Sequence, residues 1–293
     1  MLNGANKMKK NYGILYVVMS ATFFGIMPIL AKVAYSGGAN TQTTLFLRFS
    51  FAAIILFLYL RFKKISIKLK KNQLIFVFVL GIIGYTMMSV LLFMAYNYMS
   101  VGIATMTLYI YPAIVTILSS VIYKERINAK KIICLSLCII GIFIMIDLGS
   151  ASFSIIGVIL SLLASLCYSW YVLGASSNYI KSIDSYVMSF YVSLSSALAT
   201  FVIGLITNNL NFHIKAYGLV AIVIIAFIST VVALMAFLQG VKIIGPSSAA
   251  IFGTLEPIVS LILGALILGE ALTFKTMLGS FFIITSMVIL AKE

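Results

Sequence analysis

The chain has 293 residues, of which 63% are hydrophobic and 9% are charged, and its formal net charge is +14. A soluble domain carries about 25% charged residues, so polar side chains are too few here to cover the surface of a water-soluble fold. The composition excludes a soluble protein and predicts one whose surface is covered by lipid.

The positive charge does not indicate a nucleic-acid partner. A nucleic-acid site is a basic patch on one face of a domain, whereas Lys and Arg lie here in short connectors between apolar runs. Such a distribution is typical of membrane topology.

Ten apolar stretches are long enough to cross a bilayer, which requires about 20 residues. The predicted spans are at about 12–35, 43–60, 73–97, 102–122, 128–147, 155–175, 185–206, 216–238, 247–268 and 275–291. The first exceeds the apolar core of a signal peptide, which has about 7–15 residues, so we expect it to be retained. The predicted fold is all-α and integral to the membrane.

The distribution of basic residues predicts the orientation of these spans. With the N-terminus in the cytoplasm, sixteen Lys and Arg residues fall on the inner side, and only Lys215 and Lys275 fall outside. This asymmetry favours ten spans with both termini cytoplasmic, in a multi-pass protein of the plasma membrane.

An internal repeat relates the fourth and ninth spans. The stretch SSAAIFGTLEPIVSLILGALILGE at 247–270 has a weaker copy, GIATMTLYIYPAIVTILSSVIYKE, 145 residues earlier at 102–125. Pro112 then matches Pro257, and Glu125 matches Glu270. Because five spans are an odd number, the second set enters the membrane from the opposite side. We expect two five-helix repeats of inverted topology, 1–150 with the N-terminal tail and 151–293.

Three segments carry a resemblance to a known family. They are ATFFGIMPILAK in the first span, LRF at 47–49 in the second and LEPIVSLILGALILGE in the ninth. With them, nearly the whole chain resembles the drug/metabolite transporter superfamily, specifically its EamA-type ten-span carriers. The resemblance implies a 5+5 inverted-repeat fold with a central cavity that moves small metabolites, often outward. The first repeat departs from the motif, because Tyr111 stands where the second has Glu256.

Apart from the charges of the connectors and of the span ends next to them, three charged residues fall within the predicted spans, and Glu256 lies near the middle of its span. Glu256 is either a cavity residue that binds a cation, a proton or a substrate amine, or a permanent partner of a basic residue. Arg48 either binds a substrate carboxylate, which suits a bidentate guanidinium, or pairs with Glu256 or with carbonyls at a helix end. A charge in the bilayer core costs at least about 2.5 kcal/mol, so each requires a partner or a wet cavity.

The third charge, Lys32, lies near the outer end of its span, where it either snorkels to the interface or faces the cavity. If all three were ionised, the membrane core would hold one excess positive charge. This favours a ligand with a carboxylate, such as an amino acid.

Uncharged side chains supply further candidates for substrate binding. Tyr85, Ser89, Tyr109, Tyr111 and Tyr191 are candidate contacts, although most aromatic residues in such spans serve packing or interfacial anchoring. Trp170, the only tryptophan, is either an anchor at the inner interface or a gate residue.

Three prolines, Pro28, Pro112 and Pro257, are expected to bend their spans. The sequence has no phosphate-binding loop and no catalytic cluster, and its cysteines lie within apolar runs. We therefore expect no enzyme, no cofactor and no metal site.

These observations predict a secondary transporter that exports a small polar or amphiphilic, amino-acid-like metabolite by alternating access. Its partners would be the substrate, the bilayer and protons, with Glu256 as the coupling residue, and it would act as a monomer or weak dimer. An exporter of lipophilic or quaternary cations is the alternative, followed by a structural membrane protein.

Overall fold

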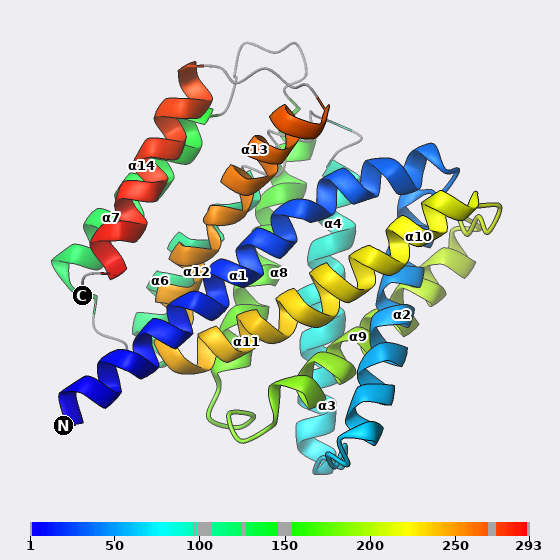
Figure 1. Cartoon of the computed structure of the whole chain (residues 1–293), viewed down its shortest axis with the longest axis horizontal. Coiled ribbons are helices and arrows are strands. Elements are labelled where there is room, and N and C mark those ends of the chain that lie inside the picture. Colours follow the sequence, from blue (N-terminus) through cyan, green and yellow to red (C-terminus); the bar gives the residue numbers. More distant parts are fainter. Residues whose placement is uncertain are drawn as a thin grey trace.

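The computed structural model describes residues 2–95, 98, 107–124, 127–145, 154–268 and 274–291. Every regular element in these ranges is helical, and no strand occurs among them. Figure 1 shows long helices lying side by side along one direction, with connectors at the two edges of the bundle. The expectation of an all-helical fold is confirmed.

The elements of the first part of the chain are α1 (Leu2–Ser36), α2 (Thr41–Phe62), α3 (Lys71–Val79), the π-helical η1 (Leu80–Thr86), α4 (Met87–Ala95), α6 (Tyr111–Ile122) and α7 (Ala129–Met145). Those of the second part are α8 (Ile155–Ser176), α9 (Ser185–Ile206), α10 (Ala216–Ile225), the π-helical η2 (Ala226–Val232), α11 (Ala233–Ile244), α12 (Pro246–Gly253), α13 (Leu255–Leu268) and α14 (Phe274–Ala291). The predicted boundary at residue 150 lies outside the described residues, as do Glu125 and Glu270.

Seven described helical stretches are long and apolar enough to cross a membrane. They are Lys10–Ser36, Thr41–Phe62, Lys71–Leu92, Ile155–Ser176, Ser185–Ile206, Ala216–Ile244 and Pro246–Ile267, and shorter apolar helices occur at Tyr111–Ile122 and Met277–Leu290. The predicted total of ten spans stays a prediction. The eighth span extends six residues beyond its predicted end, so Lys242 lies in the last turn of α11 rather than in a connector.

The helices of the two parts of the chain make equivalent contacts. α2 packs against α9 and α7 against α14, so these helices meet their own counterparts. α1 packs against α11 and α13, and in the same way α8 packs against α4 and α6. This pattern is what a two-fold axis between the two parts requires.

The two π-helical segments occupy equivalent places in this arrangement. η1 interrupts the third helical segment between α3 and α4, and η2 interrupts the eighth between α10 and α11. Each is seven residues long, and they begin 146 residues apart. π-helical turns insert one extra residue into a helix and often lie at functional sites.

The ends of α2 and α9 also correspond. Both helices have 22 residues. Asn40 caps α2 by accepting a hydrogen bond from the Thr43 amide at 2.8 Å, and Asp184 caps α9 by accepting one from the Tyr186 amide at 2.7 Å. Such side-chain caps satisfy the free N–H groups of a first helical turn.

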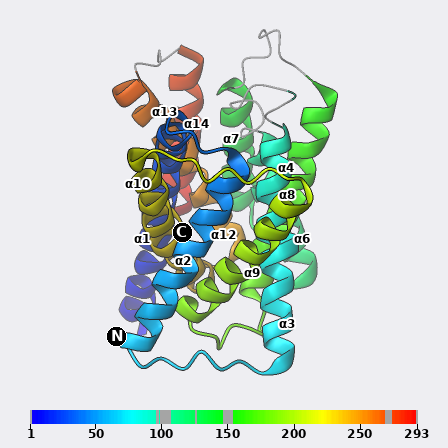
Figure 2. The same ribbon diagram turned by 90° about the vertical axis from the view of Figure 1, so that its right-hand side faces the viewer.

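The N-terminus and the connector 63–70 lie at the same edge of the bundle (Figures 1 and 2). We call this the N-terminal edge. It contains Lys63, Lys64, Lys68 and Lys70, whereas Lys215 precedes α10 at the opposite edge. The charge asymmetry noted in the sequence is therefore an asymmetry between the two edges of the bundle.

Candidate functional site

The fourth segment of each part is interrupted, and the interruption positions the site. Helix α6 begins at Tyr111 with Pro112 in its first turn, and α12 is separated from α13 by Thr254. Pro257 likewise lies near the start of α13. A proline fits the first helical turn because its missing N–H would have no intrahelical acceptor there. These two prolines begin new helices, whereas Pro28 lies within α1, which continues past it.

The interruption places Glu256 in the first turn of α13. The N-terminus of a helix carries a partial positive charge, which stabilises a nearby carboxylate. An acid in the middle of an apolar segment thereby gains a favourable electrostatic environment from the backbone alone. Its counterpart Tyr111 begins α6 in the same way but is uncharged.

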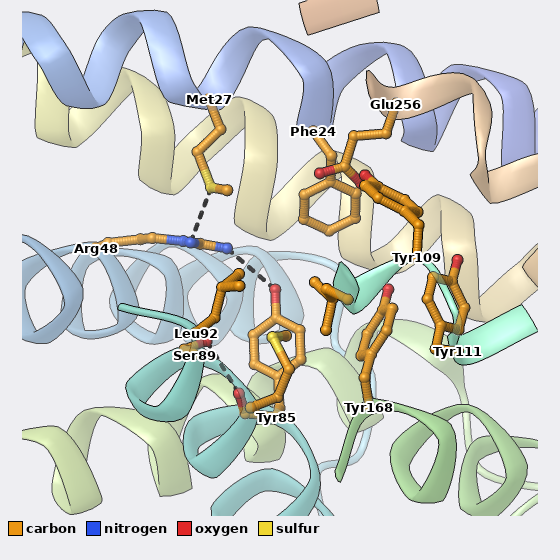
Figure 3. Close-up of a pocket in the computed structure, with 12 residues that line it drawn as sticks. Phe24, Met27, Arg48, Tyr85, Ser89, Leu92, Tyr109, Tyr111, Tyr168 and Glu256 are labelled. Atoms are coloured by element: carbon orange, nitrogen blue, oxygen red, sulfur yellow. Dashed lines mark hydrogen bonds between the residues drawn. The ribbon is translucent and has the colours of Figure 1, made fainter. Parts of the chain in front are cut away.

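A cavity of about 90 Å³ lies next to these helix starts (Figure 3). Its lining comes from α1, α2, η1, α4, the α6 region, α8 and α13, and therefore from both parts of the chain. The lining residues are Phe24, Met27, Arg48, Tyr85, Met88, Ser89, Leu92, Leu108, Tyr109, Tyr111, Tyr168 and Glu256. Pockets for drug-sized ligands measure about 300–1,000 Å³, so this conformation admits only a few waters or a small molecule.

Arg48 is buried, with 4% of its surface exposed, and each of its nitrogens has a partner. Nε donates to the Thr230 hydroxyl at 2.7 Å, Nη1 to the Met27 sulfur at 2.9 Å and Nη2 to the Tyr85 hydroxyl at 3.0 Å. Since Tyr85 belongs to η1 and Thr230 to η2, both π-helical segments bind the same guanidinium. Three of its five N–H groups are used, which leaves one on each terminal nitrogen.

Glu256 has a different environment. Its carboxyl group lies next to the Tyr109 side chain, at the far end of the cavity from Arg48 (Figure 3). No ion pair within 4.0 Å joins Glu256 to Arg48, although the structure describes both residues. Figure 3 shows the two charged groups reaching the cavity from different sides. The cavity therefore contains an acid and a base that do not neutralise each other by direct contact.

Aromatic rings form much of the remaining wall. Tyr168 contacts Tyr111 edge-on with ring centres 4.6 Å apart, and it stacks on Tyr171 at 6.1 Å. The Tyr111 hydroxyl donates to the Ala250 carbonyl at 3.3 Å, which ties α6 to α12. Ring faces of this kind attract cations.

A close backbone contact fixes α13 against α1. A methyl group added at Gly25 would lie 2.7 Å from Cβ of Val259 and 2.9 Å from the Glu256 carbonyl oxygen. Only glycine therefore allows α1 to approach the turn that carries Glu256. The Ser260 hydroxyl strengthens the contact by donating to the Gly25 carbonyl at 2.9 Å.

The structure brings six of the nine predicted binding residues to this cavity, namely Arg48, Tyr85, Ser89, Tyr109, Tyr111 and Glu256. The other three lie elsewhere. Lys32 is exposed near the end of α1, and Trp170 lines a separate groove with Tyr179. The Tyr191 hydroxyl donates to the Ile67 carbonyl at 2.9 Å, in the connector of the N-terminal edge.

Sequence reasoning missed two partners of Arg48, Met27 and Thr230. The long separation between Arg48 and Thr230 in the chain left no local signal for their contact, although Thr230 carries a hydroxyl within Ala216–Ile244, the most apolar of the seven candidate spans among the described residues. For metals, the described residues contain no group of three or more His, Cys, Asp or Glu side chains that is arranged to hold an ion.

Comparison with known proteins assigns the chain to a family. The model of the EamA-like transporter family matches twice, at residues 11–147 and 155–292. The chain belongs to the EamA-like transporter family. The two matches divide it into two repeats, and together with the apolar helices they make it a multi-pass membrane protein of a transporter family.

Relatives of this chain are likewise named as transporters. The uncharacterized transporter YyaM of Bacillus subtilis (strain 168) is 29% identical over 229 residues, covering 74% of this chain and 73% of YyaM. YcbK of the same organism, also an uncharacterized transporter, is 24% identical over 94% of this chain and 92% of its own length. A crystal structure aligns with a TM-score of 0.81 over 96% of this chain and 97% of that one, at 14% identity, and so shares the fold.

Proposed function

We propose that this protein is a secondary transporter for a small zwitterionic, amino-acid-like metabolite, which it exports across the plasma membrane. The observation that supports this is the presence of Arg48 and Glu256 in one cavity without direct pairing. A zwitterion would satisfy both charges at once.

The two charged groups suit different ends of such a substrate. The remaining N–H on each terminal nitrogen of Arg48 fits a carboxylate, which a guanidinium binds through two hydrogen bonds. Glu256 fits an ammonium group, and the faces of Tyr109 and Tyr168 add cation–π attraction. Since both charges lie in a low-dielectric interior, each interaction gains strength compared with water.

In this proposal, the two repeats move relative to each other to give alternating access. We expect the halves 1–150 and 151–293 to have inverted topology, with both termini cytoplasmic, and to open the cavity to each side in turn. The basic N-terminal edge would then face the cytoplasm. Because the cavity of about 90 Å³ is small, the present conformation corresponds to a nearly closed state.

A gradient must drive the process, and Glu256 is the proposed proton carrier. It is the only one of the six acids in the sequence that lies near the middle of a predicted span. Protonation would remove the charge that attracts the substrate ammonium, so proton and substrate would compete for one carboxylate. Such competition produces exchange of substrate against protons.

Counterflow in proteoliposomes tests the proposed substrate class. A matched panel contains a neutral amino acid, its decarboxylated amine and its deaminated acid. We expect exchange of the amino acid only, because each analogue leaves one buried charge without a partner. Equal transport of the decarboxylated amine would contradict the proposal.

Transport of lipophilic cations is the second candidate. It is favoured by the five aromatic side chains of the lining, Phe24, Tyr85, Tyr109, Tyr111 and Tyr168, and by the direct partners that Arg48 already has. In the same assay, this candidate predicts exchange of quaternary amines and indifference to a carboxylate.

A further inference from the structure

A basic groove lies at the N-terminal edge and shares no lining residue with the cavity. It has a volume of about 490 Å³ and is formed by the end of α2 and the connector that follows. Its cationic residues are Arg61, Lys64 and Lys68, and all three are exposed. Apolar side chains, including Ile65 and Ile67, line the rest.

The connector holds these cations on a rigid support. Ile65, Ile67 and Leu69 pack against the hydrophobic core, while the side chains between them are exposed. The hydrogen bond from Tyr191 to the Ile67 carbonyl, at 2.9 Å, ties the connector to α9. The alternation resembles that of a half-buried strand and keeps Lys68 on the outer side.

The end of α2 does not need these cations as caps. Backbone amides already satisfy its last carbonyls: the Lys63 amide donates to the Tyr59 carbonyl at 2.9 Å, and the Ile65 amide donates to the Leu60 carbonyl at 2.9 Å. Lys64 adopts a left-handed conformation with φ of 54°, which glycine or asparagine adopts at lower cost. A lysine at this position is therefore less favourable for the backbone than glycine or asparagine.

The second repeat makes the same turn without the cations. Helix α9 ends at Ile206 and is followed by Asn208 at φ of 48°, and the Asn209 amide donates to the Gly204 carbonyl at 3.0 Å. Asn208 is the counterpart of Lys64, 144 residues later, and at the same spacing Leu205 and Phe212 correspond to Arg61 and Lys68. The fold thus requires the turn but not the charges.

We propose that this groove binds the phosphate headgroup of an anionic phospholipid from the leaflet at the N-terminal edge. Arg61, Lys64 and Lys68 would surround the phosphate, since clusters of basic residues beside a membrane helix recognise anionic lipids. The acyl chains would lie along the exposed stripe of Ile54, Leu58 and Phe62, which are 54%, 60% and 83% exposed. These three residues are spaced four apart, so they share one face of α2, which runs from the groove toward the middle of the helix.

Native mass spectrometry of the full chain in detergent tests the site. The protein is incubated with equal amounts of phosphatidylglycerol and phosphatidylcholine that carry identical acyl chains. A basic residue near an anionic lipid surface raises the association constant by about fivefold, so we expect phosphatidylglycerol adducts to dominate by at least that factor. Equal adducts of the two lipids would overturn the proposal.

Charge variants with a matched control locate the site. Arg61→Gln/Lys64→Asn/Lys68→Gln should remove the preference. A control triple variant, Lys71→Gln/Lys130→Gln/Lys181→Gln, has the same net charge but leaves the groove intact, and it should keep the preference. An equal loss in both variants would mean attraction to overall charge and would overturn the proposal.

Two further measurements exclude simpler explanations. Lys64→Asn alone places in the first repeat the residue that the second already has, so it should fold normally and lower the preference by about fivefold. Glycerol phosphate, which has the headgroup without the chains, should not displace the lipid at equal concentration. Full displacement would indicate a site for soluble anions and would contradict lipid binding.

Discussion

The two repeats have the same backbone plan and differ in the residues that carry charge. Both interrupt their fourth segment at a proline, both contain a π-helical segment in their third, and both end their second helix in a left-handed turn. Yet Glu256 occupies the position that Tyr111 has in the first repeat, and Lys64 occupies the position that Asn208 has in the second. The comparison separates what the fold requires, which appears twice, from what we assign to function, which appears once.

The largest expected effect comes from removing the acid that only the second repeat has. Glu256→Gln should reduce transport driven by a proton gradient to the level of protein-free vesicles, because the amide cannot release a proton. Exchange of labelled for unlabelled substrate requires no release of a proton, so it should continue, although the uncharged amide binds the substrate ammonium more weakly than the carboxylate. Both rates are measurable in proteoliposomes from one preparation.

Tyr111→Phe is the matched control for this prediction. It removes a polar atom from the equivalent position of the first repeat, and we expect gradient-driven transport to continue. Loss of both activities together with loss of folded Glu256→Gln protein would assign Glu256 a structural role instead.

The second-largest expected effect comes from changing Arg48, which both π-helical segments bind. Arg48→Lys keeps the charge, but a single ammonium cannot reproduce the planar fork that reaches Tyr85 and Thr230. One lost hydrogen bond to a charged group costs about 1.5–3 kcal/mol, so the apparent affinity for a carboxylate substrate should fall by about tenfold or more. Competition binding with the amino acid and its decarboxylated amine measures this.

Thr230→Val is the milder test of the same network. It removes the acceptor of Arg48 Nε at 2.7 Å while keeping the shape of the side chain. The affinity for the carboxylate should fall less than in Arg48→Lys. An unchanged affinity would mean that Thr230 does not help to position the guanidinium.

A moderate effect is expected where α1 touches α13. In Gly25→Ala the new methyl would meet Val259 and the Glu256 carbonyl at under 3 Å, so the turn that carries the acid must shift. Overpacking of this kind costs about 1–3 kcal/mol, and the midpoint of thermal unfolding should fall. Ser169→Ala, at the equivalent place in α8, should have a smaller effect, because it only removes a hydroxyl that donates mainly to the Ser165 carbonyl of its own helix at 2.7 Å and lies 3.4 Å from the Tyr111 carbonyl.

The smallest effect is a reciprocal exchange at the left-handed turns. Lys64→Asn should stabilise the protein, and Asn208→Lys should destabilise it, each by about 1 kcal/mol or less, because asparagine adopts this conformation more readily. Thermal unfolding of the two variants in one detergent gives the comparison. A change of the same sign in both would show that side-chain contacts dominate over backbone preference.

Much of the architecture was predictable from the sequence, because the membrane imposes strong rules. The all-helical fold, the two repeats and the family are confirmed, and they follow from long apolar runs and from the matching Pro112 and Pro257, whereas the total of ten spans stays a prediction. The importance of Arg48 and Glu256 was visible because charges in apolar segments are costly. Their roles in substrate binding stay predictions.

The interior contacts were not predictable in this way. Met27 and Thr230 look like ordinary residues of apolar helices, and only the packing of α1, α2 and η2 brings them to Arg48. The π-helical segments have no marker residue, because an extra residue in a helix changes the hydrogen-bond pattern and not the composition. Trp170 was placed correctly in α8, but a helical pattern alone did not show that it lines a groove away from the cavity.

The paired π-helical segments also carry information about ancestry. One extra residue rotates everything beyond it by about 100° around the helix axis, so its gain or loss would turn a whole helical face away from its neighbours. Since η1 and η2 lie at matching places, the simplest history is a single insertion in an ancestor of half this length, before its gene was duplicated and fused. The present protein would then have inherited from that ancestor the bulge geometry that holds Arg48, while the guanidinium itself, with Val192 at the corresponding place in α9, was kept or acquired in one copy alone.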